Sequence, residues 1–174
     1  MDYLTKPTSR HDLRKYSKIF RKLFRVPLTG PFPVLEVLDR LNEIPPGSRY
    51  EILEDSEFPP KTMARCFPNE DGGFTIEIRE SVYNGAYERQ VGAYLDFINH
   101  EICHVFLYNI GFTPILERSF GNYELPAYRS VEWQAKALCG EVMVPYEESQ
   151  GMALDEIVNK YHVSKGLAKN RLQL

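Results

Sequence analysis

The segment that decides the fold reads Ile98-Asn99-His100-Glu101-Ile102-Cys103-His104. It lies within residues 91–109, where apolar residues recur at helical spacing, and it contains the pattern His-Glu-x-x-His. Four residues make about one helical turn, so both imidazoles lie on one face and can bind one cation at about 2.0–2.1 Å. Glu101 is displaced around the helix, where its carboxylate can reach a water on the open coordination position. The segment predicts a metal site with an adjacent catalytic base.

A third protein ligand is needed to complete a catalytic zinc site. The sequence predicts a second helix over residues 131–143, with Ser130 as its N-cap and Pro145 beyond its end. Small residues follow Glu132 on the same side of this helix and would let the two helices approach closely. Four carboxylates are candidates: Glu132 at the helix start, its rival Glu141 near the end, and Glu117 and Glu124 in the preceding loop, where they would be held less rigidly.

The remaining sequence predicts an α+β fold. Residues 12–24 carry an apolar stripe at helical spacing, and residues 34–41 repeat a shorter helical pattern. Residues 74–79 alternate between apolar and polar, as a half-buried strand does. Other expected elements are strands at 50–53 and 62–67, a connection at 81–87, a loop at 113–128, and two short helices between 154 and 172. We expect a small, mainly antiparallel sheet packed on the two site helices, with helical N- and C-terminal segments.

Length and composition favour one domain spanning residues 1–174. The 174 residues are 43% hydrophobic, which suits one compact core. We divide the domain into N-terminal helices (1–45), a sheet and zinc core (46–145) and a C-terminal helical segment (146–174). No apolar run reaches about 18 residues and no apolar signal segment is present, so we expect a cytoplasmic protein without membrane contact. The three cysteines are odd in number and far apart, which predicts reduced thiols.

Charge argues against direct nucleic-acid binding. The formal net charge is −3, whereas phosphate binding is driven by an excess of lysine and arginine. Basic residues are nevertheless concentrated before residue 26, where a solvated helix face is the simplest interpretation and a partner surface the alternative. Residues 155–172 could form a DNA-binding helix-turn-helix. This segment is short for such a motif and contains only four basic residues to meet phosphates. Packing or substrate docking is therefore the better interpretation.

Three stretches of the sequence resemble the ImmA/IrrE family of metallo-endopeptidases. They are Phe74-Thr75-Ile76-Glu77-Ile78-Arg79-Glu80-Ser81-Val82-Tyr83, the motif from His100 to His104, and Tyr128-Arg129-Ser130-Val131-Glu132-Trp133-Gln134-Ala135 continuing to Met143-Val144-Pro145. The similarity extends from the first helix to Leu172. Cys103 departs from the family pattern, where glycine is usual, as does Leu138-Cys139, where Phe-Ala is usual. Neither departure removes a ligand.

The resemblance implies a zincin-like metallopeptidase core. One Zn²⁺ per chain would be bound by His100, His104 and Glu132, with Glu101 as the catalytic residue, and this donor set suits zinc. It further implies limited proteolysis of a helix-turn-helix (XRE-type) transcriptional repressor in a prophage, mobile-element or stress-response circuit. The C-terminal helices or the basic first helix would dock this substrate. The alternative is a non-proteolytic zinc-binding regulatory or toxin-like docking protein, against which Glu101 argues, because zinc binding requires no glutamate there.

A peptidase of this kind needs further groups around the metal. Glu101 would take a proton from water and return it to the leaving amine. The oxyanion needs another hydrogen-bond donor, and the candidates are Tyr108, Tyr123, Tyr128 and His162. The peptide would lie along an exposed edge strand beside the motif helix. We expect residues 74–79 to form that edge, with Phe74, Ile76 and Ile78 as candidate substrate-binding residues.

Overall fold

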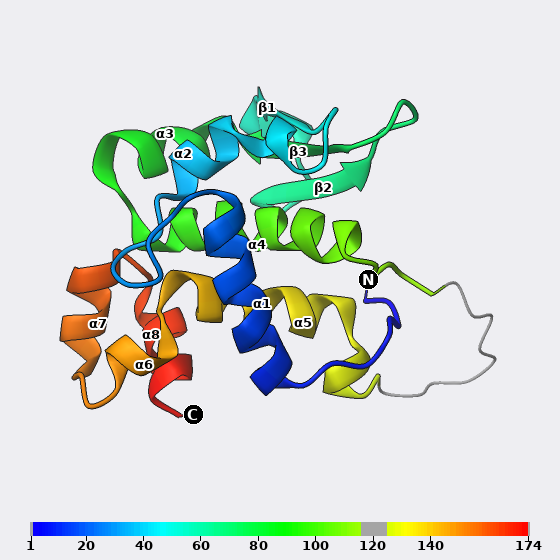
Figure 1. Ribbon diagram of the computed structural model, residues 1–174. Helices are drawn as coiled ribbons and strands as arrows, with labels where there is room; N and C mark the ends of the chain where they lie inside the picture. The colour runs from blue at the N-terminus through cyan, green and yellow to red at the C-terminus, as the bar shows by residue number, and fades with distance from the viewer. Residues whose placement is uncertain (1, 116–124, 174) are drawn as a thin grey trace.

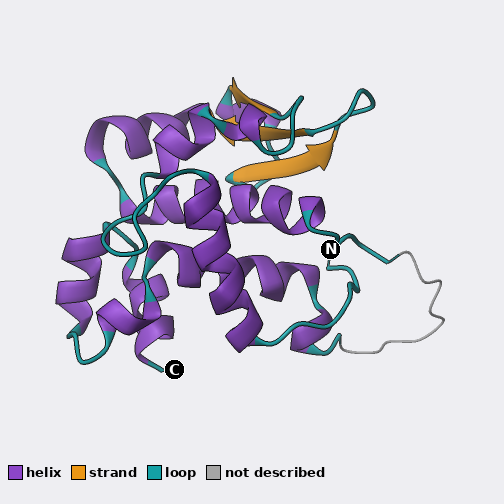
Figure 2. Ribbon diagram, viewed as in Figure 1, coloured by secondary structure: helices purple, strands orange, loops and turns teal. Residues whose placement is uncertain are grey.

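The computed structural model describes residues 2–115 and 125–173 of the chain. Over these residues the protein has an α+β fold in layers: a three-stranded sheet packs on α4 (Gly92–Asn109), and α5 (Val131–Met143) packs on α4 from the other side (Figure 1). The strands gather on one side of the molecule and helices form most of the rest (Figure 2). The prediction of an α+β fold is confirmed.

The helices and strands have the following bounds. In chain order, with η for 3-10 helices, the other elements are α1 (Arg10–Leu23), α2 (Val34–Asp39), η1 (Leu41–Glu43), β1 (Arg49–Leu53), η2 (Asp55–Glu57), β2 (Ala64–Pro68), β3 (Phe74–Arg79), α3 (Glu80–Arg89), η3 (Ala127–Arg129), α6 (Tyr146–Ser149), α7 (Leu154–Tyr161) and α8 (Lys165–Leu172). Among the described residues, no helix is both long and apolar enough to cross a membrane. The predicted helices at 12–24, 91–109 and 131–143 and the two C-terminal ones are confirmed.

The sheet is mixed, and the prediction of a mainly antiparallel sheet is wrong. Its strand order is β1-β3-β2. β3 pairs in parallel with β1, where Tyr50 lies opposite Ile76, and antiparallel with β2, where Cys66 lies opposite Ile76. Because period-two alternation is the same for either strand direction, the sequence pattern identified the strands without their pairing.

The central position of β3 also overturns its assignment as an edge strand. Ile76 and Ile78 are fully buried, and β3 is paired along both of its sides. Phe74 packs its ring on Tyr108 of α4, with ring centroids 5.6 Å apart. A peptide therefore cannot add to β3. The outer strands are β1 and β2, and β2 is the one that lies along α4.

The expected connection at residues 81–87 is instead the helix α3. Gly85 and the preceding asparagine read as a turn signal in the sequence. In the structure Gly85 is buried inside α3, and a Cβ there would lie 2.4 Å from ring atoms of Tyr94. The glycine is needed for the close approach of α3 and α4 rather than for a turn.

The basic residues of α1 are largely used inside the fold. Arg21 is 2% exposed and donates hydrogen bonds to backbone carbonyl oxygens of Val142, at 2.9 Å, and of Gly30, also at 2.9 Å. Lys18 forms an ion pair with Glu147 at 2.6 Å. On the opposite side, Phe20 stacks on Phe106 of α4, with centroids 4.6 Å apart. Basic residues of α1 thus stabilise the packing of this helix against its neighbours.

Candidate metal centre

α4 presents His100 and His104 toward α5. The two helices can approach closely because Ala135 and Cys139, both buried, lie at their contact. Asn99, also fully buried, donates a hydrogen bond from Nδ2 to Cys139 Sγ at 3.4 Å. His104 is 4% exposed, while the side chain of His100 is 23% exposed. The pair therefore sits at the rim of the interface, with one imidazole inside and one open to solvent.

The first turn of α5 supplies the carboxylate of Glu132. Ser130 caps this helix as predicted, since its Oγ accepts a hydrogen bond from Trp133 N at 2.8 Å. Asp2 adds a second cap that the sequence gave no signal for. Its Oδ2 accepts a hydrogen bond from Ser130 Oγ at 2.6 Å, and its Oδ1 accepts one from Glu132 N at 3.2 Å. The N-terminal segment thereby fixes the turn that carries Glu132.

Three side chains converge with the spacing of a metal site. The Nε2 atoms of His100 and His104 are 3.0 Å apart. Glu132 places Oε2 at 3.2 Å from His100 Nε2 and Oε1 at 3.5 Å from His104 Nε2. Two ligands at about 2.05 Å from a tetrahedral ion lie about 3.3 Å apart. The three separations scatter around that value, so these residues fit a single zinc ion.

The other carboxylates considered for the third ligand do not join this group. Glu141 is buried at the far side of α5, where its Oε1 accepts a hydrogen bond from Arg171 Nη1 at 2.7 Å and its Oε2 one from Arg14 Nε at 3.1 Å. Glu117 and Glu124 lie outside the described residues. Among the residues that the structure describes, Glu132 is the carboxylate that meets both histidines.

Glu101 is half-buried on α4 beside the three ligands. Burial raises the pKa of its carboxyl above the ordinary value, although the charges of His104 and His100 lower it in part. Hydrogen bonds with His100 and His104 hold the pKa of Glu132 far below its usual range. The pKa values of the two carboxyls are thus driven in opposite directions, that of Glu132 downward by the histidines and that of Glu101 upward by burial.

Of the predicted oxyanion donors, Tyr108 lies at the site. It follows His104 by one helical turn, with ring centroids 5.6 Å apart, and burial raises the pKa of its phenol well above the usual value. It remains a neutral O–H donor at any ordinary pH. Tyr128 is 53% exposed in η3, and His162 is exposed at the C-cap of α7; within the described ranges neither has a contact with the three ligands. Tyr123 lies outside the described residues.

Asp96, one turn before His100, makes stability depend on pH. Its Oδ2 accepts a hydrogen bond from Ser164 N at 3.1 Å, and burial raises the pKa of its carboxyl from 3.8 to about 6. Between these values the folded chain retains a proton that the unfolded chain has released, so stability falls as pH rises through this window. Asp96→Asn keeps an acceptor but cannot ionise. We expect this substitution to stabilise the protein at pH 7 by on the order of 1–3 kcal/mol. The free energy of unfolding should also fall less steeply as pH rises.

Urea unfolding of wild type and Asp96→Asn at pH 4.5 and pH 7 measures this effect. Asp71→Asn, at an exposed turn, is the control and should leave both free energies of unfolding unchanged. Equal pH slopes in the wild type and Asp96→Asn would show that Asp96 ionises in the folded protein as it does in water.

Fold and site together define a class of protein. It is an α+β protein in which two histidines and one carboxylate are spaced to bind a single divalent ion beside a half-buried glutamate. The sequence matches no model of a known protein family and no curated protein.

Proposed function

We propose that this protein is a zinc-dependent endopeptidase with a zincin-like core, belonging to the ImmA/IrrE family that its sequence resembles. The observation that carries the proposal is the triangle of His100, His104 and Glu132, whose donor atoms have tetrahedral spacing with Glu101 next to them on α4. Sites that bind zinc only for structure use four protein ligands, whereas three ligands leave a position for a reacting water.

Each residue of the site has a defined role in peptide hydrolysis. His100, His104 and Glu132 would hold the ion, which lowers the pKa of a water and polarises the substrate carbonyl. Glu101 would accept a proton from the attacking water as the C–O bond forms, and would then deliver that proton to the amine nitrogen as the C–N bond breaks. Tyr108 would donate a hydrogen bond to the oxygen that gains negative charge.

The peptide would bind along β2, which takes the place first assigned to β3. β2 is an outer strand of the sheet and lies along α4, so an extended peptide added to it would run past the metal ligands. Cys66, in the middle of β2, is near enough to Glu101 for the charge of that carboxylate to contribute to raising the pKa of its thiol, after burial. This proximity supports a peptide path between β2 and the catalytic base.

The proposed substrate is a helix-turn-helix (XRE-type) transcriptional repressor in a prophage, mobile-element or stress-response circuit. The support is the resemblance of the sequence to the ImmA/IrrE family. A cytoplasmic setting would follow from such a substrate. Because α1 uses Arg14, Lys18 and Arg21 for contacts within the fold, the helices α7 and α8 are better candidates than α1 for docking it.

Metal content of the purified protein tests the centre directly. We expect one zinc per wild-type chain and a metal affinity lowered by at least about 100-fold in Glu132→Ala, since loss of groups beyond the ligands alone costs 10–100-fold. Glu36→Ala, an exposed glutamate of α2, is the matched control and should bind zinc normally. Chelation should lower the Tm of wild type, because zinc binds only the folded chain.

Incubation with helix-turn-helix (XRE-type) repressors tests the activity. One cut in the repressor by the zinc-loaded wild type supports the endopeptidase. Zinc binding together with an uncut but tightly bound repressor would favour the non-proteolytic docking protein. A chain without affinity for zinc would refute both.

A further inference from the structure

A cavity of about 710 Å³ opens beside His100, between α4, α5 and α8. Its walls include the apolar surfaces of Phe97, Trp133 and Leu167. Two basic side chains with access to solvent, Arg10 and Lys136, also line it. The cavity thus combines an apolar surface with positive charge, next to a metal ligand.

The charge balance around the cavity is positive. Arg171, which also lines it, shares the single carboxylate of Glu141 with Arg10 and Arg14; the nitrogen-to-oxygen distances are 2.7, 3.9 and 3.1 Å. Three guanidinium groups therefore face one carboxylate. Burial lowers the pKa of Arg10, Glu141 raises it, and the charges of Arg171 and Arg14 lower it. A further negative charge at this place would relieve the repulsion.

Several hydrogen-bond donors of Arg10 and Arg171 have no acceptor among the described residues. Arg171 is 6% exposed, and its Nε and Nη2 atoms have no hydrogen-bond partner among the described residues; nor has Arg10 Nη1. Buried guanidinium donors without partners are unfavourable and are normally found with an acceptor. Asp96 also lines the cavity, but its Oδ2 already accepts from Ser164 N. Among the described residues, Glu141 is therefore not enough to satisfy Arg10 and Arg171, and a second anionic acceptor is missing at this wall of the cavity.

We propose that this cavity is the subsite that receives an acidic side chain of the substrate, glutamate or aspartate, on one side of the cleaved bond. The inference rests on the proposed function and deepens it by naming a specificity. The short apolar stem of a glutamate suits walls such as Trp133, and its carboxylate meets Arg10 and Lys136. The volume exceeds that of one side chain, so neighbouring substrate residues enter with it.

Trp133 is the only tryptophan of the chain, so its fluorescence reports occupancy of the cavity. The probes are two capped pentapeptides, one with a central glutamate and one with glutamine, added to zinc-loaded Glu101→Gln, which should cleave them too slowly to disturb the binding measurement. We expect the glutamate peptide to bind about tenfold more tightly. Equal affinities would overturn the proposal. Free glutarate binding as tightly as the peptide would overturn the assignment to the substrate and identify a site for small dicarboxylates.

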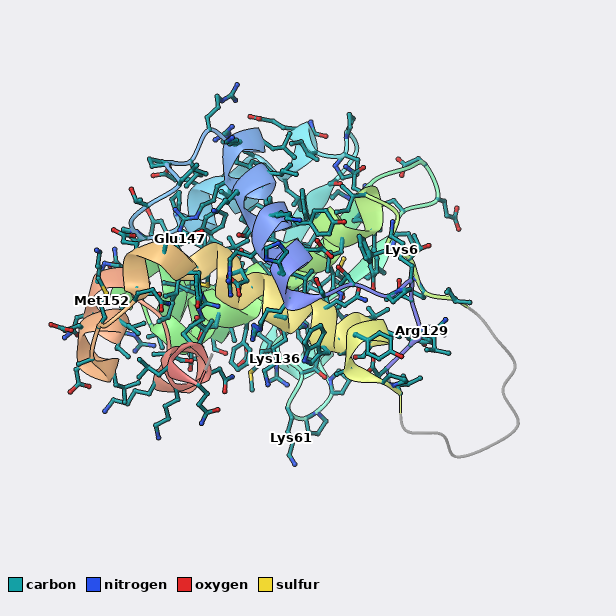
Figure 3. All side chains as sticks on the ribbon, turned by 60° about the horizontal axis from the view of Figure 1, so that its bottom comes forward. Lys6, Lys61, Arg129, Lys136, Glu147 and Met152 are labelled. Atoms are coloured by element: carbon teal, nitrogen blue, oxygen red, sulfur yellow. The ribbon has the colours of Figure 1, made fainter. Side chains whose placement is uncertain are left out.

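Lys136 is the residue to change, because Arg10 and Arg171 also stabilise Glu141. Lys136→Glu should abolish the preference for glutamate, whereas Lys61→Glu should retain it. Figure 3 labels both exposed lysines. Lys136 on α5 lines the cavity, whereas Lys61, in the turn before β2, is not among the lining residues. A preference that survives in Lys136→Glu would overturn the role of this cavity.

Cleavage of a mixed peptide library separates this inference from the proposed function. Wild type should cut with an acidic residue enriched at one fixed position from the bond, and Lys136→Glu should lose that enrichment while still cutting. Cleavage without any acidic preference would overturn the subsite and leave the peptidase standing. Zinc-loaded wild type that cuts nothing, yet binds the glutamate peptide selectively, would overturn the peptidase and support an acidic-peptide site.

Discussion

Glu101→Gln is expected to lower kcat/KM for peptide cleavage by about 10²–10⁴-fold while zinc content stays at one per chain. Glutamine has nearly the shape of glutamate but cannot accept the proton of the attacking water or pass it to the leaving amine. The proposed ligands His100, His104 and Glu132 are unchanged, and their donor atoms have the spacing that a tetrahedral ion requires. Cleavage rates and metal analysis of the same preparation measure both effects.

Glu88→Gln is the control for this experiment, since Glu88 is exposed on α3. It should cleave at the wild-type rate. Wild-type cleavage by Glu101→Gln would show that another group accepts the proton. Loss of zinc from Glu101→Gln would instead show that this carboxylate contributes to metal binding.

Glu141→Ala is expected to destabilise the fold by about 3–5 kcal/mol, the usual effect of removing one partner from a buried ion pair. The side chains of Glu141 and Arg171 are 0% and 2% exposed, and Arg14 and Arg10 depend on the same carboxylate. Without it, three guanidinium groups are left close together between α1, α5 and α8. Urea unfolding measures the change in the free energy of unfolding.

Glu147→Ala provides the comparison, because Glu147 pairs with Lys18 at the surface, where the two side chains are 60% and 46% exposed. Its loss should cost less than about 1 kcal/mol. Below the unfolding transition, Glu141→Ala should still bind zinc, since Glu141 is no ligand. An undiminished free energy of unfolding in Glu141→Ala would mean that the arginines find other partners.

The parts of the site that could be predicted are those set by local sequence. The spacing of His100 and His104 determines that they share a helical face, whatever surrounds the helix. Ser130 caps α5 through a bond three residues along the chain. Both predictions needed only the geometry of one helix, and the structure agrees with both.

The choice between Glu132 and Glu141 required knowledge of packing. At about 100° per residue, positions nine apart point to opposite sides of a helix. The sequence favoured Glu132 because small residues share its side of the helix, but it left Glu141 as a rival. In the structure Cys139, on the side of Glu132, contacts Asn99 of α4, whereas Glu141 pairs with Arg171 of α8.

The direction and order of the strands could not be predicted from the sequence either, because they too depend on packing. β3 is central because β2 crosses to its far side from β1, an arrangement that depends on contacts between distant segments. Its buried isoleucines indicated a strand but not how many neighbours it has. The role of Asp2 is likewise set by tertiary packing, since an aspartate near the N-terminus carries no local signal for capping a helix that begins at Val131.

The hydrogen bonds between Asp2 and the start of α5 have a consequence for the order of folding. Asp2 is separated by 128 residues from Ser130 and by 130 from Glu132. A contact of such sequence distance closes one of the longest loops in the chain and forms slowly compared with the helices themselves. While the chain is being synthesised, α4 emerges with His100 and His104 before Glu132 of α5 is available. In the proposed zinc site, firm metal capture would therefore be one of the last events of folding.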